Sequence, residues 1–255
     1  MKIGKVLRML LSERDEKGKI HLTLIDPEKT SPEEAERIAM TAADAGSTAI
    51  LIGGSLGIFE PLLSEVVRAV RKSGLPVILF PGNINGLTPH ADAVLFMTLM
   101  NSDDPYYVTG VQAQAAPIVL RMGIEPIPTA YIIVGYGGAA GYIGRARPIP
   151  YERSDILAAY ALASAMMGAS LIYLEAGSGA PQPIPPSSVR VVKSVLNSAG
   201  FDGLLIVGGG INSPEVAAAI AEAGADGIVN GTLVEKDPRS LYDMVNSLRL
   251  RSSRH

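Results

Sequence analysis

Two acidic residues stand at the ends of β-rich runs, where a carboxylate can do chemistry. Asp26 is followed by Pro27, which keeps the aspartate out of a helix and suits it to bind a cation. Glu175 lies two positions after Tyr173 and therefore shares its face of a strand, where it can orient a substrate hydroxyl or take a proton. Ser55, after another run, adds a hydroxyl next to glycine. The structural alternatives are a turn cap for Asp26, a helix cap for Ser55 and a buried ion pair for Glu175.

Glycine-rich segments follow the last three β-rich runs and predict a phosphate site. Ala176-Gly177-Ser178-Gly179 comes directly after Glu175, and its glycines let backbone N–H groups approach an anion. Gly208-Gly209-Gly210 and Gly231-Thr232 end the two runs that follow, where β/α barrels commonly bind phosphate. Each glycine run alone is compatible with a tight turn, so the prediction rests on their occurrence together.

The remaining reactive residue types favour carboxylate or metal-assisted chemistry. The chain has no cysteine, which excludes disulfides and thiolate chemistry. Of the three histidines, His21 opens the first run at the end away from the predicted site, His90 lies in an irregular turn, and His255 is terminal. The sequence shows no histidine–carboxylate cluster at metal-ligand spacing and offers no base for a nucleophilic serine.

The elements that must position these residues alternate between short β-rich runs and longer stretches at helical spacing, which is typical of parallel βαβ units. The predicted strands are Ile20–Ile25, Thr48–Ile52, Pro76–Phe80, Ala93–Met97, Glu125–Val134, Ser170–Glu175, Gly203–Val207 and Gly227–Asn230. Their almost continuous apolar character is expected when both faces of a strand are covered. Eight such units and 255 residues match a single β/α barrel.

Helix signals support this pattern, with two interruptions. Ser31 and Ser213 are each followed by proline and glutamate, which predicts helix starts, and the second helix is expected to end at Gly224. Between the third and fourth runs the segment NINGLTPHAD leaves no room for a crossover helix, so we expect an irregular or displaced element there. Gly135–Tyr151 is glycine-rich and is expected to be a functional loop at the barrel mouth rather than a helix.

Composition limits the function classes. Hydrophobic residues make up 47% of the chain and charged residues 18%, which is typical of a large packed core. A net charge of -3 argues against nucleic acid as a partner. The longest apolar runs are too short to cross a bilayer, and the N-terminus is a poor signal peptide, so we expect a cytoplasmic protein. The chain reads as one domain over 1–255, with an N-terminal helix and lead-in at 1–19 and a flexible tail at 251–255.

Five segments, LTLIDPEK, ILIGGS, YLEAGSG, VGGGI and GTLVEKDP, resemble in this order the geranylgeranylglyceryl phosphate synthase family and its bacterial heptaprenylglyceryl relatives. The resemblance runs from about Ile20 to Asp237, and the combination of DPEK with YLEAGSG is specific. It implies an α/β fold, a modified (β/α)8 TIM barrel with an irregular or displaced third helix, in agreement with the interruption after the third run.

The resemblance also implies an activity. It is the Mg²⁺-dependent transfer of a geranylgeranyl group from geranylgeranyl diphosphate to the C3 hydroxyl of sn-glycerol 1-phosphate, in archaeal-type membrane phospholipid biosynthesis. By position, magnesium falls on Asp26 and Ser55, with the glycerol phosphate on Tyr173, Leu174, Glu175, Ala176, Gly177, Ser178 and Gly179 and its phosphate on Gly208, Gly209, Gly231 and Thr232. Thr232 departs from the asparagine of many members, although a hydroxyl can also donate to phosphate.

Several expectations complete this interpretation and leave alternatives open. Glu175 would deprotonate the attacking hydroxyl, and Lys29 would either assist the leaving group or be solvated. Tyr131, Tyr136 and Tyr142 are candidates for an isoprenoid groove or ordinary surface packing. We expect a homo-oligomer, a dimer or hexamer, with peripheral membrane contact open. The rival functions are a phosphosugar isomerase or lyase on the same barrel and a barrel that only binds a phosphorylated effector.

Overall fold

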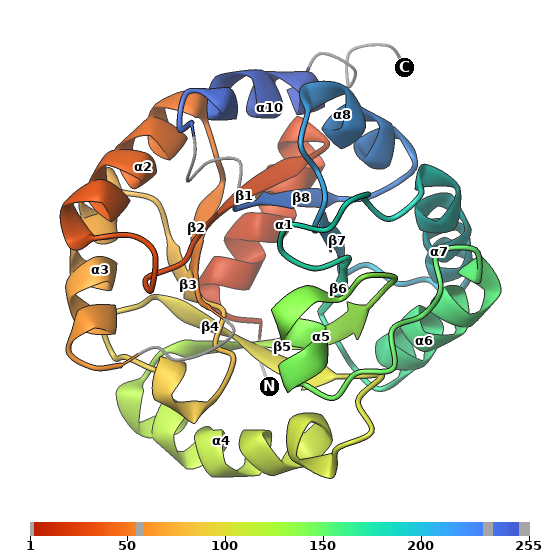
Figure 1. Ribbon diagram of the computed structural model, residues 1–255, viewed down its shortest axis with the longest axis horizontal. Helices are drawn as coiled ribbons and strands as arrows, with labels where there is room; N and C mark the ends of the chain where they lie inside the picture. Colours follow the sequence, from red (N-terminus) through yellow and green to blue (C-terminus); the bar gives the residue numbers. More distant parts are fainter. Residues whose placement is uncertain (1–2, 55–58, 232–236, 250–255) are drawn as a thin grey trace.

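The computed structural model describes residues 3–54, 59–231 and 237–249 of the 255-residue chain, in which eight parallel strands close into a barrel in sequence order (Figure 1). The strands are β1 (Ile20–Ile25), β2 (Ala49–Ile52), β3 (Val77–Leu79), β4 (Ala93–Leu99), β5 (Glu125–Ile133), β6 (Leu171–Glu175), β7 (Leu204–Gly208) and β8 (Gly227–Asn230). The barrel prediction is confirmed, and each predicted strand end lies within two residues of the observed one.

Helices surround the strands. They are α1 (Lys5–Lys17), α2 (Pro32–Ala45), α3 (Leu62–Val70), α4 (Val111–Met122), α5 (Gly138–Ile143), α6 (Ser154–Met166), α7 (Pro186–Ser198), α8 (Pro214–Glu222) and α10 (Ser240–Arg249). Both predicted serine caps are confirmed, because Ser31 accepts a hydrogen bond from the N–H of Glu34 and Ser213 from that of Val216. None of the described helices is long and apolar enough to span a membrane.

Side chains alternate between two cores along every strand. Leu171 and Tyr173 of β6 belong to the core inside the barrel, whereas Ile172 and Leu174 pack in the layer between the sheet and the helices. The strand register places Glu175 between Ile133 of β5 and Gly208 of β7. The last inward-facing side chain of β6 is therefore a carboxylate at the C-terminal mouth of the barrel.

The predicted interruption after the third strand is confirmed. Between β3 and β4 the chain forms only a short 3-10 helix, η2 (Ile84–Gly86), where a regular barrel would carry a crossover helix. The connection after β4 is also irregular, because α4 is preceded by a π-helix, η3 (Tyr106–Gly110). Such π-helical turns are rare and often lie at functional sites.

The prediction of a loop without helix over Gly135–Tyr151 is wrong in part. Residues Gly138–Ile143 form the helix α5, which lies over the barrel mouth in Figure 1. A Cβ at position 144 would lie 2.4 Å from a methyl of Leu99, so the absence of a side chain lets this segment pack closely on the barrel. Packing thus overrides the low helix propensity of glycine at this place.

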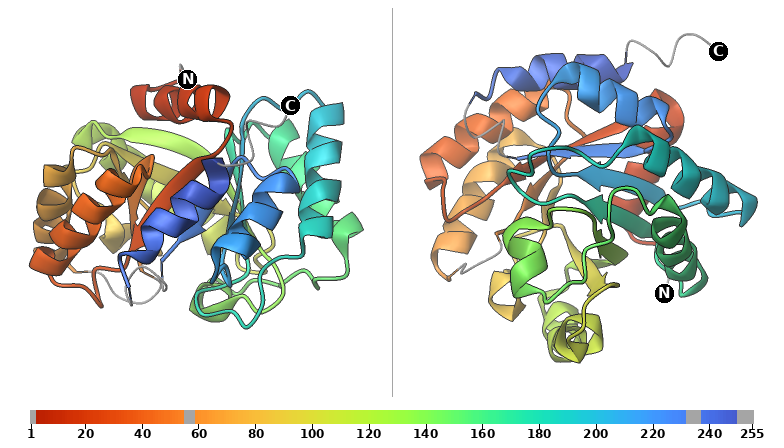
Figure 2. Two further views of the ribbon diagram at one scale, coloured as in Figure 1. Left: turned by 90° about the horizontal axis from the view of Figure 1, so that it is seen from above. Right: turned by 45° about the vertical axis from the view of Figure 1, so that its right-hand side comes forward.

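The opposite end of the barrel is covered by α1, as Figure 2 shows. Val6, Leu7 and Leu10 of this helix are buried against the core inside the barrel. At the start of the helix, the N–H groups of Val6 and Leu7 donate to the carboxylate of Glu125, the first residue of β5, at 2.7 and 2.9 Å. A carboxylate at this position satisfies N–H groups that lack partners within the helix.

Candidate active site

A cavity of about 720 Å³ opens at the C-terminal mouth of the barrel. Its lining includes seven of the predicted site residues, namely Asp26, Tyr173, Glu175, Ser178, Gly179, Gly209 and Gly231. Four others, Leu174, Ala176, Gly177 and Gly208, do not line it. Two further predicted residues, Ser55 and Thr232, lie outside the described residues, as do the tail at 251–255 and His255.

Leu174 and Ala176 show why a contiguous motif does not translate into contiguous contacts. Both side chains are fully buried in the core between the sheet and the helices, on the face away from the cavity. The N–H of Ala176 donates to the carbonyl of Gly208, so it is already engaged within the protein. The side chains of Leu174 and Ala176 therefore do not line this cavity.

Glu175 is buried at the floor of the cavity, and the burial raises the pKa of its carboxyl group. Three neighbours oppose that shift: the N–H of Gly177, which donates to Oε1 at 2.7 Å, and the hydroxyls of Tyr173 and Tyr131. The structural alternative of a Lys or Arg partner is not observed, since no ion pair of Glu175 occurs among the described residues. A buried carboxyl with a raised pKa is suited to proton transfer.

An aromatic cluster stands beside this carboxyl. The rings of Tyr131 and Tyr173 meet edge to face at 5.2 Å, and Phe80 stacks on Tyr173 at 5.4 Å. The cluster fixes the Tyr173 ring, whose buried hydroxyl lies near the Glu175 carboxyl but forms no hydrogen bond of good geometry with any described residue. A buried hydroxyl without a well-formed hydrogen bond is costly, and a polar ligand in the cavity would relieve that cost.

The loop after β7 packs its backbone directly against Glu175. Gly209 and Gly210 have φ angles of 83° and 68°, in the left-handed region that favours glycine. A Cβ at position 209 would lie 2.5 Å from Oε1 of Glu175 and 2.6 Å from the nitrogen of Gly177. Only glycine therefore allows this approach, and the loop leads into the N-terminus of α8, a setting that suits an anion.

Asp26 lies on the other side of the mouth and is nearly buried. It accepts the N–H of Glu28 at 3.1 Å and pairs with Nζ of Lys29 at 2.8 Å. Lys29 was predicted either to assist or to be solvated; its side chain is 58% exposed but also lines the cavity. Asp26 thus caps a turn and faces the cavity as well, so the two alternatives are compatible.

Glycine also shapes the space next to Asp26. A Cβ at position 54 would lie 2.7 Å from Oδ1 of Asp26 and 3.4 Å from Oε2 of Glu28. Two carboxylates therefore face one small gap, which is a donor set that suits a hard cation such as Mg²⁺. Glu28 was not singled out from the sequence, although its place in the DPEK segment could have indicated it.

The remaining wall of the cavity is mainly apolar. It is formed by Phe80, Met97, Leu99, Tyr107, Val111, Tyr131 and Ile143, from the ends of β3, β4 and β5 and from η3, α4 and α5. Of the three tyrosines proposed for a groove, Tyr131 and Tyr136 line the cavity, whereas Tyr142 is 86% exposed and does not. The cavity therefore joins a polar, glycine-lined half to an apolar half.

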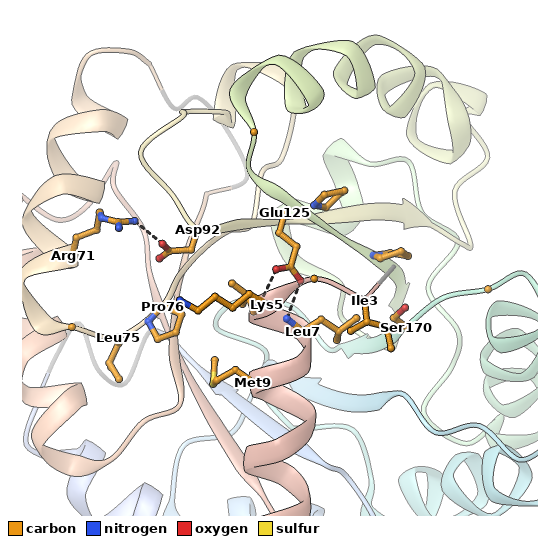
Figure 3. A pocket seen from close by; sticks show the side chains of 17 residues that line it. Ile3, Lys5, Leu7, Met9, Arg71, Leu75, Pro76, Asp92, Glu125 and Ser170 are labelled. Carbon is orange, nitrogen blue, oxygen red and sulfur yellow. Dashed lines mark hydrogen bonds and ion pairs between the residues drawn. The ribbon is translucent and has the colours of Figure 1, made fainter. Parts of the chain in front are cut away.

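A second cavity, of about 860 Å³, lies at the opposite end of the barrel beside the start of α1 (Figure 3). Three of its charged residues are engaged in the fold: Glu125 accepts hydrogen bonds from N–H groups of α1, and Arg71 donates to Asp92 at 2.8 Å. Neither its size nor its charge distinguishes it from the mouth. The polar groups at the mouth differ because they include the buried Glu175 carboxyl with a raised pKa and the Tyr173 hydroxyl, which has no well-formed hydrogen bond to a described residue.

Comparisons with known proteins show which family the chain resembles over nearly its whole length. A model of the PcrB family matches residues 11–248. The geranylgeranylglyceryl phosphate synthase of Aeropyrum pernix is 55% identical over 251 residues, which is 98% of this chain and 98% of that protein. The corresponding protein of Pyrococcus horikoshii is 50% identical over 237 residues, covering 92% of this chain and 91% of that protein.

Two solved structures share the fold of this chain. The (S)-3-O-geranylgeranylglyceryl phosphate synthase of Thermoplasma acidophilum, crystallised with its substrate sn-glycerol-1-phosphate, superposes with a TM-score of 0.91 at 40% identity and covers 97% of this chain and 100% of its own. A thiamine phosphate pyrophosphorylase from Pyrococcus furiosus covers 91% of this chain and 97% of its own, with a TM-score of 0.57 at 16% identity. The second likeness is one of fold alone.

Proposed function

The chain belongs to the PcrB family, and from this premise we propose that it is a geranylgeranylglyceryl phosphate synthase. It transfers a geranylgeranyl group from geranylgeranyl diphosphate to the C3 hydroxyl of sn-glycerol 1-phosphate. The observation that carries the proposal is the junction of two unlike halves in one cavity, with the raised-pKa carboxyl of Glu175 on its floor. The acceptor and the lipid donor would meet above that carboxyl.

The polar half takes the glycerol phosphate. Backbone N–H groups of glycine loops and the N-terminus of α8 suit the phosphate, because both present positive partial charge to an anion. The Tyr173 hydroxyl, which has no well-formed hydrogen bond to a described residue, can bond a glycerol oxygen next to Glu175. With the phosphate fixed at the glycine loops, the far hydroxyl of a three-carbon acceptor is directed toward the allylic carbon.

Glu175 then acts as the general base. In the transfer step, the bond between the allylic C1 carbon and the diphosphate oxygen breaks, and the electron pair leaves with the diphosphate. The C3 oxygen of the glycerol forms the new ether bond to C1, and its proton passes to the Glu175 carboxylate. Burial favours this transfer, because it raises the proton affinity of the carboxylate.

The apolar half takes the isoprenoid chain. The missing crossover helix between β3 and β4 leaves the side of the mouth next to Phe80 without a regular helix. The wall there is completed by Tyr107 and Val111, which the π-helix η3 and the start of α4 supply. Apolar side chains on this wall stabilise a hydrocarbon tail in proportion to the area that is removed from water.

We further propose that Mg²⁺ binds at Asp26, with Glu28 as a second oxygen donor. The gap that glycine leaves at position 54 and the two carboxylates facing it fit a small hard cation. When bound, the ion would neutralise charge on the diphosphate leaving group. Lys29, which pairs with Asp26, adds positive charge on the same side of the cavity. Ser55, the other predicted ligand, lies outside the described residues.

We also propose that the protein is a homo-oligomer. Leu120, Met166 and Met167 have exposed fractions of 82%, 75% and 74% in the isolated chain. Association with a second copy is one way to remove such side chains from water. Light scattering on the purified protein would give the mass, and a monomer at micromolar concentration would contradict this part of the proposal.

The experiment for the main proposal is incubation with labelled geranylgeranyl diphosphate and sn-glycerol 1-phosphate, followed by extraction into butanol. We expect a labelled ether lipid that requires both substrates, forms with Mg²⁺ and disappears when EDTA removes it. The phosphosugar isomerase or lyase alternative predicts no such product with any metal. Failure to form product from either enantiomer of glycerol phosphate would contradict the proposed function.

A further inference from the structure

A row of buried polar side chains runs behind the site, on the outer face of the barrel. His21 and Thr23 come from β1, Ser47 from the turn before β2, and Asn230 from the end of β8. His21 contacts Ser47 at 2.8 Å through Nδ1 and Asn230 at 3.1 Å through Nε2. The sequence predicts His21 at the end of the barrel away from the site, yet its ring contacts Asn230 at the end of β8, next to the mouth.

The direction of each hydrogen bond follows from its neighbours. Nδ2 of Asn230 donates to the carbonyl of Ile211 at 2.9 Å, which leaves the amide oxygen of Asn230 facing Nε2 of His21. Nε2 must therefore carry a hydrogen. Burial lowers the pKa of His21 to about 4, so the ring is neutral near pH 7 and its Nδ1 accepts from the hydroxyl of Ser47. The Thr23 hydroxyl then donates to Ser47, at 2.9 Å.

The far end of this row is the glycine loop that faces the cavity. Ile211 directly follows Gly209 and Gly210, which line the polar half of the site, and the backbone of Gly209 lies against Glu175. Asn230 itself directly precedes Gly231, which also lines the cavity. Asn230 and Ile211 line the cavity as well, so one amide side chain joins the loops after β7 and β8 at the edge of the site.

The donor on His21 and the carbonyl of Ile211 together fix how that amide is oriented. If the Asn230 amide were reversed, its oxygen would face the carbonyl oxygen of Ile211, and its NH2 group would face the N–H of His21. Both contacts would then be mismatched, and in a buried setting each mismatch carries a free-energy cost. A donor at the Nε2 position therefore holds the loop carbonyl in one place.

We propose that His21 is a positioning residue for the phosphate end of the site, acting through Asn230 on the glycine loop at Gly209 and Gly210. The inference rests on the proposed function, because it assigns that loop to the phosphate of the acceptor. His21 itself does not contact the substrate in this proposal. Losing the Nε2 donor should weaken binding of the glycerol phosphate and leave the isoprenoid side of the cavity unchanged.

Two substitutions separate this role from simple packing. His21→Gln keeps an amide N–H near the former Nε2, whereas His21→Asn reaches only as far as the former Nδ1 and loses the donor to Asn230. We expect His21→Asn to raise KM for sn-glycerol 1-phosphate about tenfold, with kcat and KM for geranylgeranyl diphosphate within about threefold, as one mismatched buried hydrogen bond predicts. His21→Gln should restore KM to within about threefold of wild type.

The matched control is His90→Asn, because His90 is a partly exposed histidine on the turn after η2 and contacts Arg68 rather than the site. It should leave all three kinetic constants unchanged. Equal losses in His21→Gln and His21→Asn, or an unchanged KM for glycerol phosphate in His21→Asn, would reduce His21 to a packing residue and overturn the inference.

A second variant covers the case in which His21→Asn does not fold. Asn230→Asp has the same shape, keeps an acceptor for His21 and loses the donor to Ile211, so the same selective rise in KM is expected. A wild-type KM for glycerol phosphate in folded Asn230→Asp would also overturn the inference. Failure of the proposed function is distinguishable, because it would remove prenyl transfer from the wild-type protein before any variant is compared.

Discussion

The two ends of the barrel carry cavities of similar size, about 720 Å³ at the mouth and about 860 Å³ beside α1, but they use carboxylates in opposite ways. At the α1 end, Glu125 accepts two backbone N–H groups and contributes to the stability of the fold. At the mouth, Glu175 is buried with a raised pKa, next to a tyrosine hydroxyl that forms no hydrogen bond of good geometry with a described residue. Cavity volume therefore does not identify the active site here.

The difference between the two glutamates lies in what the fold gains from each. A carboxylate that receives N–H groups at the start of a helix stabilises the native state in its charged form. A carboxylate whose burial raises its pKa destabilises the native state when charged, because the folded protein holds the proton more tightly than the unfolded chain. The first kind of glutamate is expected to serve structure and the second to serve catalysis, at some cost in stability.

The largest effect that would test this contrast is expected from Glu175→Gln. Loss of the base should lower kcat by about 10²–10⁴-fold. In the wild-type protein kcat/KM should fall as pH decreases through the raised pKa of Glu175, and this limb should be missing from the residual activity of the variant. Steady-state kinetics between pH 5 and 9, buffered at constant ionic strength, would measure both.

The same variant should not lose stability near neutral pH. Because the folded-state pKa of Glu175 is raised, its stabilising contribution is present at low pH and is lost as pH rises through that pKa. Glu175→Gln should therefore equal the wild type in Tm at low pH and match or exceed it at pH 8. An inactive variant with a lower Tm at pH 8 would indicate a structural glutamate and remove the contrast.

Asp26→Asn is expected to have the next largest effect. It keeps the acceptor for the N–H of Glu28 and removes the charge, so the proposed cation site loses its main ligand while the turn is retained. Apparent affinity for Mg²⁺, measured by titrating activity with the metal, should fall on the order of 10–100-fold. Asp243→Asn, on an exposed position of α10, is the control and should leave the titration unchanged.

The smallest effect on catalysis is expected from Glu125→Ala, although it should affect stability most. Removing the acceptor for Val6 and Leu7 should lower the free energy of unfolding by about 1–2 kcal/mol, and Tm by about 2–8 °C. kcat and KM should remain within about twofold, because chemistry in barrels is confined to the other end. The control is Glu16→Ala, at an exposed position of α1, the helix whose N–H groups Glu125 holds. A large loss of activity at full stability would contradict the division between the two ends.

Much of the architecture could be predicted from the sequence because it depends on local signals. The strands are short apolar runs, and the helices after Ser31 and Ser213 begin with strong caps. Glu175 and Tyr173 were placed on one face by strand periodicity alone, and the structure agrees. The second of these helices ends at Glu222, two residues before the predicted Gly224, whose φ of 115° keeps it out of any helix.

What the sequence could not supply depends on contacts between distant segments. The six-residue helix α5 forms because glycine lets it approach Leu99, which lies about 45 positions earlier in the chain. Leu174 and Ala176 belong to the recognisable segment, but their side chains face the outer core, so motif membership does not predict which side chains line the cavity. The position of His21 near the start of β1 argues against a role at the site, although its side chain contacts Asn230, the last residue of β8.

The helix α1, which covers one end of the barrel, limits how substrates can enter and product can leave. Its buried Val6, Leu7 and Leu10 fill the base of the barrel together with the inward-facing strand residues. A tail of twenty carbons has no route through such a packed floor. Both substrates and the lipid product then use the same opening of the cavity, so the product must leave before the next prenyl donor can bind. A membrane or a lipid-binding protein near that opening would speed product release.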